Sequence, residues 1–402
     1  MATSEDKGTP SAEPTAQKIH RSRGSTASER LLADLGEQAF LNLWSYPNLF
    51  YEKKQNGKGD GKELCDMLVV CGDDVIIFSD KHIKYQSDKH AQIAWPRFYR
   101  KAIEAAVAQI NGANNWITRY PDKIFTDSAC TQRLPIELPP LERRRVHGVV
   151  VATGAHAAIQ DAMNDDSGSF MIKPSLKGQD AIDFSAEDFI PFCIGDVNPG
   201  GMLIHVFDDV AIRRVLEHLN TITDFTRYLN KREAYLRSDK LLIAHGEEEL
   251  LAGYLTTGIM TGGNYDFELP RKKKAEKFVR MTVQGEWSAY LGSDAYFAKT
   301  MADEKSKTWD RLINLFTENV VAGTSVSILG TEPTVTLSER GLRFMAMESR
   351  FSRRMLGEAV EGALKTAMKL KQDRYARVIF PNQASADRSQ ARLCHYDCRL
   401  SH

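Results

Sequence analysis

A group of acidic residues around one lysine is the feature of this sequence best suited to chemistry. Asp66 precedes one short apolar segment and Ser79-Asp80-Lys81 follows the next, with a three-residue turn between the two segments. Such a pattern predicts a tight β-hairpin. If the hairpin is centred on the middle of the turn, Asp66 lies opposite Asp80. A shift of half a residue places Ser79 or Lys81 there instead. Glu63 reaches the same end of the hairpin.

Carboxylates gathered around a lysine suit a hard divalent cation. Mg²⁺ is usually held by one or two protein carboxylates, keeps several water molecules and takes further ligands from phosphate. The bound ion neutralises a phosphodiester and activates the attacking water, while a lysine stabilises the developing charge or orients that water. We therefore expect Asp66 and Asp80 to bind Mg²⁺ or Mn²⁺, with Glu63 as the alternative second ligand, and Lys81 to act on the transition state.

The elements that would position these residues follow from hydrophobic spacing. A helix is expected to begin after Thr26, where Thr26 and Glu29 have the spacing of a capping box. Apolar spacing predicts the remaining elements in the order strand, hairpin, helix, strand: 49–52, 67–71 with 75–78, 97–109 and 146–152. The first 150 residues therefore have the predicted order αβββαβ.

This order, with Asp66 and Lys81, resembles the PD-(D/E)XK superfamily of restriction-endonuclease-like nucleases over residues 26–152. In that family an aspartate opens the second strand, and an acidic-X-lysine triplet ends the third. The resemblance implies that Asp66, Asp80 and Lys81 form the catalytic site. It also implies a glutamate on the first helix, for which Glu29 and Glu37 are the candidates.

The triplet departs from the family pattern at one position. Ser79 stands where the family has an acidic residue, and the acid comes one place later. Successive side chains of a strand point to opposite faces, so Asp80 joins the site only if the strand ends or bulges there. An alternative register uses Asp80, His82 and Lys84. Gln109, on the second helix, falls where some relatives carry a glutamine.

A basic loop precedes the hairpin. The segment KKQNGKGDGK, residues 53–62, combines glycines with lysines and is predicted to be a mobile loop. Its lysines are suited to backbone phosphates. The candidate nucleic-acid-binding residues are Lys53, Lys54, Lys58, Lys62 and Lys84.

Composition limits the alternatives. The chain of 402 residues has 53 Lys and Arg against 53 Asp and Glu, and 42% apolar residues, which is typical of a globular protein without a global field toward polyanions. No stretch approaches the ~20 apolar residues of a membrane span, and the cysteines lack the spacing of a disulfide scaffold. We therefore expect a cytoplasmic protein with no membrane contact.

The predicted organisation is an α/β protein with a restriction-endonuclease-like core and a mixed, mostly helical C-terminal region. Four segments are expected: a disordered lead-in (1–25), the endonuclease-like domain (26–155), an α/β extension (156–262) and the helical region (263–402). Trp95 and Trp116 are assigned to the core. The arginines between Arg340 and Arg354 are suited to gripping nucleic acid, but a charge run is more often a solvated face, which is the interpretation preferred here.

The function expected from the resemblance is metal-dependent hydrolysis of phosphodiester bonds by an endonuclease of microbial genome defence or repair. DNA is the expected substrate and RNA the alternative. A homodimer and a complex with a partner subunit are both left open. Two other functions compete: a catalytically inactive nuclease-fold protein that binds nucleic acid or a partner subunit, and a purely structural role.

Overall fold

The structure is a computed structural model that describes residues 18–52, 61–164, 168–187, 189–237, 242–260, 266–267, 281–325, 334–371, 374–379 and 394–399. Lys53, Lys54 and Lys58 of the predicted basic loop lie outside these ranges, as does the predicted lead-in up to residue 17. Within the described residues, no helix has both the length and the apolar character that crossing a membrane requires. The predicted mixed α/β class is confirmed.

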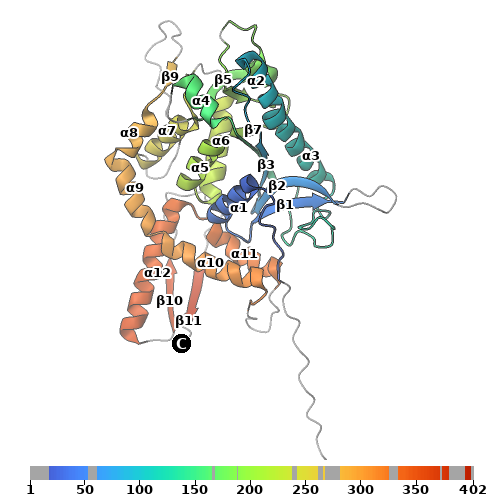
Figure 1. Cartoon of the computed structure of the whole chain (residues 1–402). Coiled ribbons are helices and arrows are strands. Elements are labelled where there is room, and N and C mark those ends of the chain that lie inside the picture. The colour runs from blue at the N-terminus through green and yellow to red at the C-terminus, as the bar shows by residue number, and fades with distance from the viewer. Residues whose placement is uncertain are drawn as a thin grey trace, which may run out of the picture.

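A five-stranded mixed sheet lies at the centre of the molecule (Figure 1), in the order β1-β2-β3-β4-β7. The β1–β2 and β2–β3 pairs are antiparallel, whereas β3–β4 and β4–β7 are parallel. The strands are β1 (Ser45–Tyr51), β2 (Lys62–Cys71), β3 (Asp74–His82), β4 (Arg145–Thr153) and β7 (Ile204–Phe207). The boundary predicted at residue 155 does not divide this sheet from the rest of the chain, because β7, after that residue, is one of its five strands.

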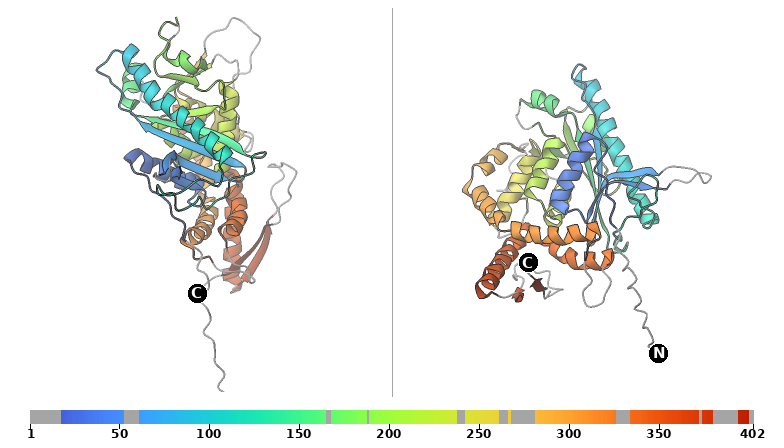
Figure 2. Two further views of the ribbon diagram at one scale, coloured as in Figure 1. Left: turned by 90° about the vertical axis from the view of Figure 1, so that its right-hand side faces the viewer. Right: turned by 60° about the horizontal axis from the view of Figure 1, so that its bottom comes forward.

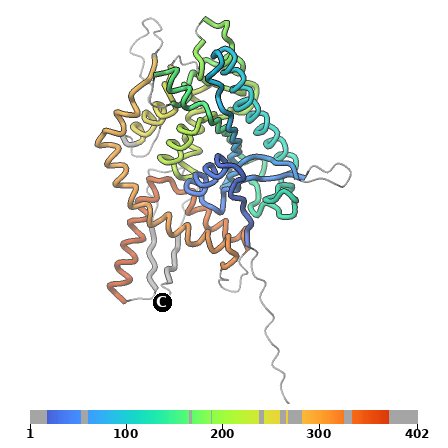
Figure 3. The backbone as a smooth tube through the Cα atoms, in the orientation of Figure 1, coloured from blue at the N-terminus to red at the C-terminus, as the bar shows by residue number. Residues whose placement is uncertain are grey.

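Helices cover both faces of this sheet. On one face lie α1 (Ala27–Phe40), α5 (Asp209–His218) and α6 (Ile222–Leu236). On the other lies α3 (Ala105–Arg119), which continues from α2 (Ala91–Phe98) through a π-helical turn at Tyr99–Glu104. Figure 3 shows α1 beside the later helices α5 and α6. Phe40, Phe78 and Phe225 pack together between the sheet and these helices.

The predicted capping box starts α1. The Thr26 hydroxyl accepts a hydrogen bond from the Glu29 backbone N–H at 3.2 Å, and the Glu29 carboxylate accepts one from the Thr26 N–H at 3.4 Å. The helix ends at Phe40, although Leu43 and Trp44 continue its apolar spacing, because Leu41 has a positive φ of 65°. This early end lets β1 begin at Ser45, which pairs with Val69.

The central hairpin divides into a fork. Its ladder runs from Cys71–Asp74 to Met67–Phe78 and stops there. Beyond that point β2 stays paired with β1, as in Cys65–Leu49, and β3 stays paired with β4, as in Ser79–Val150. We call this place the fork: residues 63–66 of β2 and 79–81 of β3. The register places Ser79, rather than Asp80, opposite Asp66.

A second sheet and the remaining helices complete the fold. The sheet has the order β6-β5-β8-β9: β5 (Met171–Lys177), β6 (Cys193–Asp196), β8 (Leu242–Ala244) and β9 (Met281–Val283). The helices are α4 (His156–Met163), a 3₁₀ turn at Gly178–Ile182, α7 (Glu247–Met260), α8 (Glu286–Leu291), α9 (Asp294–Glu304), α10 (Lys307–Ala322), α11 (Val335–Ala346) and α12 (Arg350–Leu370). Figure 2 shows α12 with the hairpin of β10 (Arg374–Ile379) and β11 (Cys394–Arg399) at one end of the molecule.

The C-terminal helices are joined to the first half by buried polar contacts. The Trp44 indole donates to Glu339 at 2.8 Å, and the Arg350 N–H donates to Asp224 at 2.6 Å. Residues 18–25, part of the predicted lead-in, also pack here, since the Ile19 N–H bonds the Val321 carbonyl at 2.9 Å.

The interpretation of the arginines of this region as a solvated face holds for Arg340, which is exposed, but is wrong for most of the others. Arg350 and Arg353 are buried and both bind Asp310. Arg343 pairs with Glu339, and Arg354 with Asp303. Carboxylates of the helices themselves occupy these guanidinium groups.

Candidate active site

Asp66 is the centre of the fork. Its side chain is 5% exposed, and Oδ2 accepts a hydrogen bond from the Asp80 backbone N–H at 2.8 Å. The Lys81 ammonium lies 3.4 Å from the same oxygen and 3.2 Å from the Asp80 carbonyl. The separation of β2 from β3 makes this possible, because the Asp80 N–H has no strand partner on that side. The predicted proximity of Asp66 and Lys81 is therefore observed.

Glu63 lies at the open rim of the fork. Its carboxyl group hydrogen bonds with that of Asp66, although much of the side chain remains exposed. Desolvation, followed by the neighbouring Asp66 charge, raises the pKa of Glu63 to about 7. At neutral pH Glu63 therefore carries a proton part of the time, and a cation that displaced this proton would find two carboxylates side by side.

Asp80 points to the other face of the sheet. β3 runs without a bulge to His82, so strand alternation turns the Asp80 carboxyl toward α1, where it hydrogen bonds with Ser28. Oδ1 is buried and has no hydrogen-bond partner among the described residues. Burial, followed by the Asp66 charge, raises the pKa of Asp80. Asp80 therefore donates its backbone N–H to Asp66, while its own carboxyl lies on the opposite face of the sheet.

Ser79 faces α3. Its hydroxyl donates to the Gln109 side-chain oxygen at 2.7 Å. Ser79, Lys81 and Gln109 therefore lie on one side of the sheet, and the position that is acidic in the resembled family is occupied by a hydroxyl held by an amide. The alternative triplet is not assembled, since β3 ends at His82, whose ring bonds Thr153 at 2.8 Å, and Lys84 is exposed beyond it.

The two helix glutamates separate. The charge of Glu29 is close enough to raise the pKa values of Glu63 and Asp80 slightly. Burial raises its pKa, but hydrogen bonds from Asn48, at 2.8 Å, and from the start of α1 outweigh burial and hold the pKa of Glu29 below its ordinary value. Glu37 is more than half exposed and pairs with Arg21, away from the fork.

Asn48 is a site residue that sequence patterns did not identify. It is 5% exposed and has a positive φ of 50°. Asparagine tolerates this conformation better than most residues, which is why it is common in turns. Its position in Tyr46-Pro47-Asn48 predicts a turn, but not that its amide would hold Glu29. Nothing in the local pattern shows that contact.

The donor set can be compared with what Mg²⁺ requires. The described residues contain no group of three or more His, Cys, Asp or Glu placed to hold a metal. Mg²⁺ does not need three, since one or two carboxylates with water and phosphate suffice. Asp66 and Glu63 fit that requirement better than Asp66 and Asp80, because they share one side of the fork. Lys62, exposed at the start of β2, adds a positive charge at the rim.

No family model, curated protein or solved structure matches this chain.

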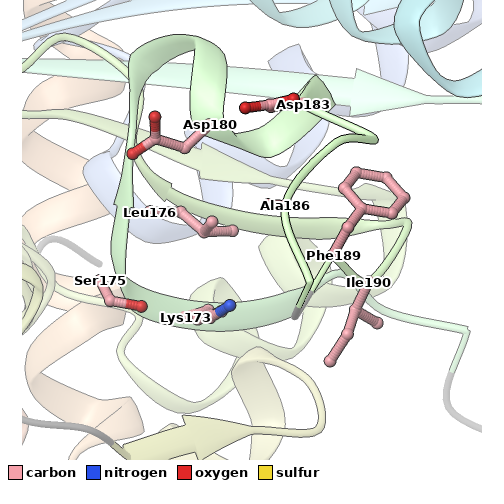
Figure 4. A pocket seen from close by; sticks show the side chains of 8 residues that line it. All are labelled: Lys173, Ser175, Leu176, Asp180, Asp183, Ala186, Phe189 and Ile190. Atoms are coloured by element: carbon pink, nitrogen blue, oxygen red, sulfur yellow. The ribbon is translucent and has the colours of Figure 1, made fainter.

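A separate cavity of about 290 Å³ lies against β5. Figure 4 shows Lys173, Asp180 and Asp183 around it, with Phe189 and Ile190 at its side. Asp180 accepts the Lys177 N–H at 3.0 Å, and Asp183 accepts the Ser185 N–H at 2.9 Å. Both carboxylates therefore cap local turns, and the grouping of acid and lysine at the fork remains the stronger candidate.

Proposed function

We propose that this protein is a metal-dependent nuclease that hydrolyses phosphodiester bonds with the residues of the fork, and that its first sheet is a PD-(D/E)XK-like core. One observation carries the proposal. A single buried carboxylate oxygen of Asp66 binds both the Asp80 N–H and the Lys81 ammonium, where β2 and β3 separate. Charged groups at the ends of two apolar strands have no packing reason to converge, because burying them costs free energy.

Each residue has a role set by its position. Asp66 and Glu63 would hold Mg²⁺, which supplies an activated water and neutralises phosphate when bound. Lys81, whose side chain is 27% exposed, can turn from Asp66 toward a phosphate oxygen and stabilise the charge that develops there. The Asp80 N–H fixes the orientation of the Asp66 carboxylate. In this arrangement Glu63, from β2, supplies the second carboxylate that the resembled family has at the position of Ser79.

The inactive nuclease-fold protein is the second candidate. The Ser79–Gln109 hydrogen bond favours it, because this contact occupies the position where a second metal ligand would stand. The two candidates differ in a measurable way: an inactive protein binds nucleic acid and leaves it intact at every metal concentration.

The test is cleavage by the purified full chain. Supercoiled DNA, linear DNA and RNA are incubated with Mg²⁺, Mn²⁺ or EDTA, and binding is measured in parallel. Lys81→Ala is compared with Lys89→Ala, which removes an exposed lysine outside the fork. We expect metal-dependent cleavage that falls by about 10²–10³-fold in Lys81→Ala alone. Tight binding without cleavage in any metal favours the inactive candidate.

A further inference from the structure

Three aromatic side chains form a ladder at the end of α3. The ring centroids of Tyr51 and Trp116 are 4.3 Å apart, and those of Trp116 and Tyr120 are 4.7 Å apart. The Lys123 ammonium lies 5.4 Å from the centre of the Tyr120 ring. Tyr120 is 44% exposed and Trp116 is half-buried. Trp116 therefore packs against the core while part of its ring stays exposed, whereas Trp95 is fully buried as predicted.

The ladder is held in place by the backbone around it. The Trp116 indole N–H donates to the Lys123 carbonyl at 3.0 Å, and the Tyr120 N–H donates to the Trp116 carbonyl at 2.8 Å. The loop that follows is fixed to β1 by two backbone hydrogen bonds of 2.9 Å between Phe50 and Phe125. The rings therefore form a preorganised surface that loses little conformational entropy when it binds a ligand.

The ladder lies on the same side of the sheet as the Asp66–Lys81 pair. The Ser79 hydroxyl, on the same face of β3 as Lys81, bonds Gln109 of α3. Trp116 follows Gln109 by seven residues on the same face of α3, which is about 10 Å along the helix axis. The Trp116 ring in turn contacts Tyr51. Figure 1 shows this end of α3 beside the outer ends of β1 and β2.

Charge and chemistry favour one ligand. Exposed aromatic rings beside cations bind single-stranded nucleic acid, because every base has a π-face and the cations neutralise the backbone. Arg119 and Lys123 flank Tyr120, and Lys62 pairs with Tyr51, while Asp122 and Glu52 are the neighbouring carboxylates in sequence. A duplex keeps its base faces covered and would gain little from these rings. A spacing of about 10 Å corresponds to roughly three nucleotides stacked at ~3.4 Å each.

We infer that the Tyr51–Trp116–Tyr120 ladder binds unpaired bases of a nucleic-acid strand a few nucleotides from the scissile phosphate. This inference rests on the proposed nuclease function, since it assigns a substrate class to the same site. The protein then acts on single strands, or on duplexes with an unpaired end or gap, in preference to intact duplex. The bases are held by stacking, so the preference is for unpaired structure and not for one sequence.

The experiment measures binding without metal. A fluorescent DNA strand of about 12 nucleotides, its RNA counterpart, an abasic strand of equal length and a duplex are titrated with the full chain in EDTA. Tyr120→Ala is the test variant, and Tyr120→Phe keeps the ring. Phe297→Ala is the matched control, because Phe297 is an exposed aromatic residue on α9, 55% exposed.

We expect the wild-type chain to bind the base-bearing strands roughly ten- to hundredfold more tightly than the abasic strand. Tyr120→Ala abolishes that difference, whereas Tyr120→Phe and Phe297→Ala retain it. Equal affinity for base-bearing and abasic strands, or unchanged binding by Tyr120→Ala, overturns the inference. Base-dependent binding without cleavage in Mg²⁺ contradicts the nuclease function alone, and cleavage of duplex without base-dependent binding contradicts the ladder alone.

Discussion

At the scale of single residues, the fork concentrates charge that its surroundings compensate only in part. Lys81 balances Asp66, and desolvation, followed by the Asp66 charge, raises the pKa of Glu63. The buried Oδ1 of Asp80 has no hydrogen-bond partner among the described residues. Charged groups that lack full compensation lower stability and are typical of functional sites, where a bound ligand compensates them. A cation at the rim would do so for Asp66 and Glu63, whereas the Asp80 carboxyl lies on the other face of the sheet.

The pH dependence of cleavage tests Glu63. With a folded-state pKa of about 7, Glu63 must lose its proton before it can bind a metal. The cleavage rate in limiting Mg²⁺ should therefore rise through pH 7 in the wild type. Glu63→Gln should lose most of the activity and also the rise. A rate profile from about pH 5 to about pH 9 checks this, and an unchanged profile in the variant contradicts the role of Glu63.

Stability without metal should move in the opposite direction. The pKa of Glu63 is raised from the ordinary 4.5 to about 7, so between these values the folded chain binds more protons than the unfolded chain. The contribution of Glu63 to stability then falls as the pH rises through this window. In EDTA, the melting temperature of Glu63→Gln relative to that of the wild type should therefore rise from pH 5 to pH 8. A constant difference between the two melting curves would show that Glu63 has no raised pKa.

At the scale of elements, close backbone approaches decide how the helices pack. Gly357 in α12 lies against the backbone at Lys305, and a methyl group there would collide with the Lys305 carbonyl oxygen. Gly341 in α11 has no atom within 4 Å of the place where a methyl group would stand. The close contact therefore requires glycine at position 357, whereas no contact requires it at position 341.

Alanine at these two positions should have opposite effects. Gly357→Ala is expected to lower the free energy of unfolding by about 1–3 kcal/mol, because neither backbone can yield easily. Gly341→Ala is expected to raise it by about 0.5–1 kcal/mol through the better helix propensity of alanine. Urea unfolding of both variants measures the difference. Equal shifts would mean that the contact at Gly357 is not tight.

Local patterns predicted the elements of the first half well. The capping box at Thr26, the apolar segments around the turn and the buried strand before Gly154 all form as expected. The strand register, and therefore the face on which each side chain lies, was harder to predict, because a shift of one residue decides whether Asp80 or Ser79 lies opposite Asp66. The contact of Asn48 with Glu29 and the three-ring ladder join segments distant in sequence, which no local pattern encodes.

At the scale of the whole molecule, the C-terminal helices are part of one structure with the first sheet. Glu339 of α11 binds the Trp44 indole, and Asp310 of α10 binds both Arg350 and Arg353 of α12. Arg353 is 2% exposed. A basic run in sequence suggests a solvated face, but a single carboxylate on a neighbouring helix is enough to bury two of its members.

Loss of that carboxylate should weaken the whole fold. Asp310→Ala leaves Arg353 buried without its partner, which we expect to cost about 2–3 kcal/mol, less than a fully buried pair because Asp310 is 23% exposed. Glu318→Ala, at an exposed position of the same helix, should change stability by less than about 0.5 kcal/mol. Thermal unfolding compares the two variants. Similar melting temperatures would contradict a structural role for the pair.

The most direct test of the nuclease function is the initial rate of plasmid nicking in Mg²⁺ by Asp66→Ala beside the wild type, with Asp88→Ala as the control for loss of an exposed aspartate outside the fork. We predict that the wild type and Asp88→Ala nick the plasmid at similar rates, that EDTA stops both, and that Asp66→Ala loses at least about 10²-fold while remaining folded. Nicking by Asp66→Ala at the wild-type rate would contradict the assignment of the fork as the active site.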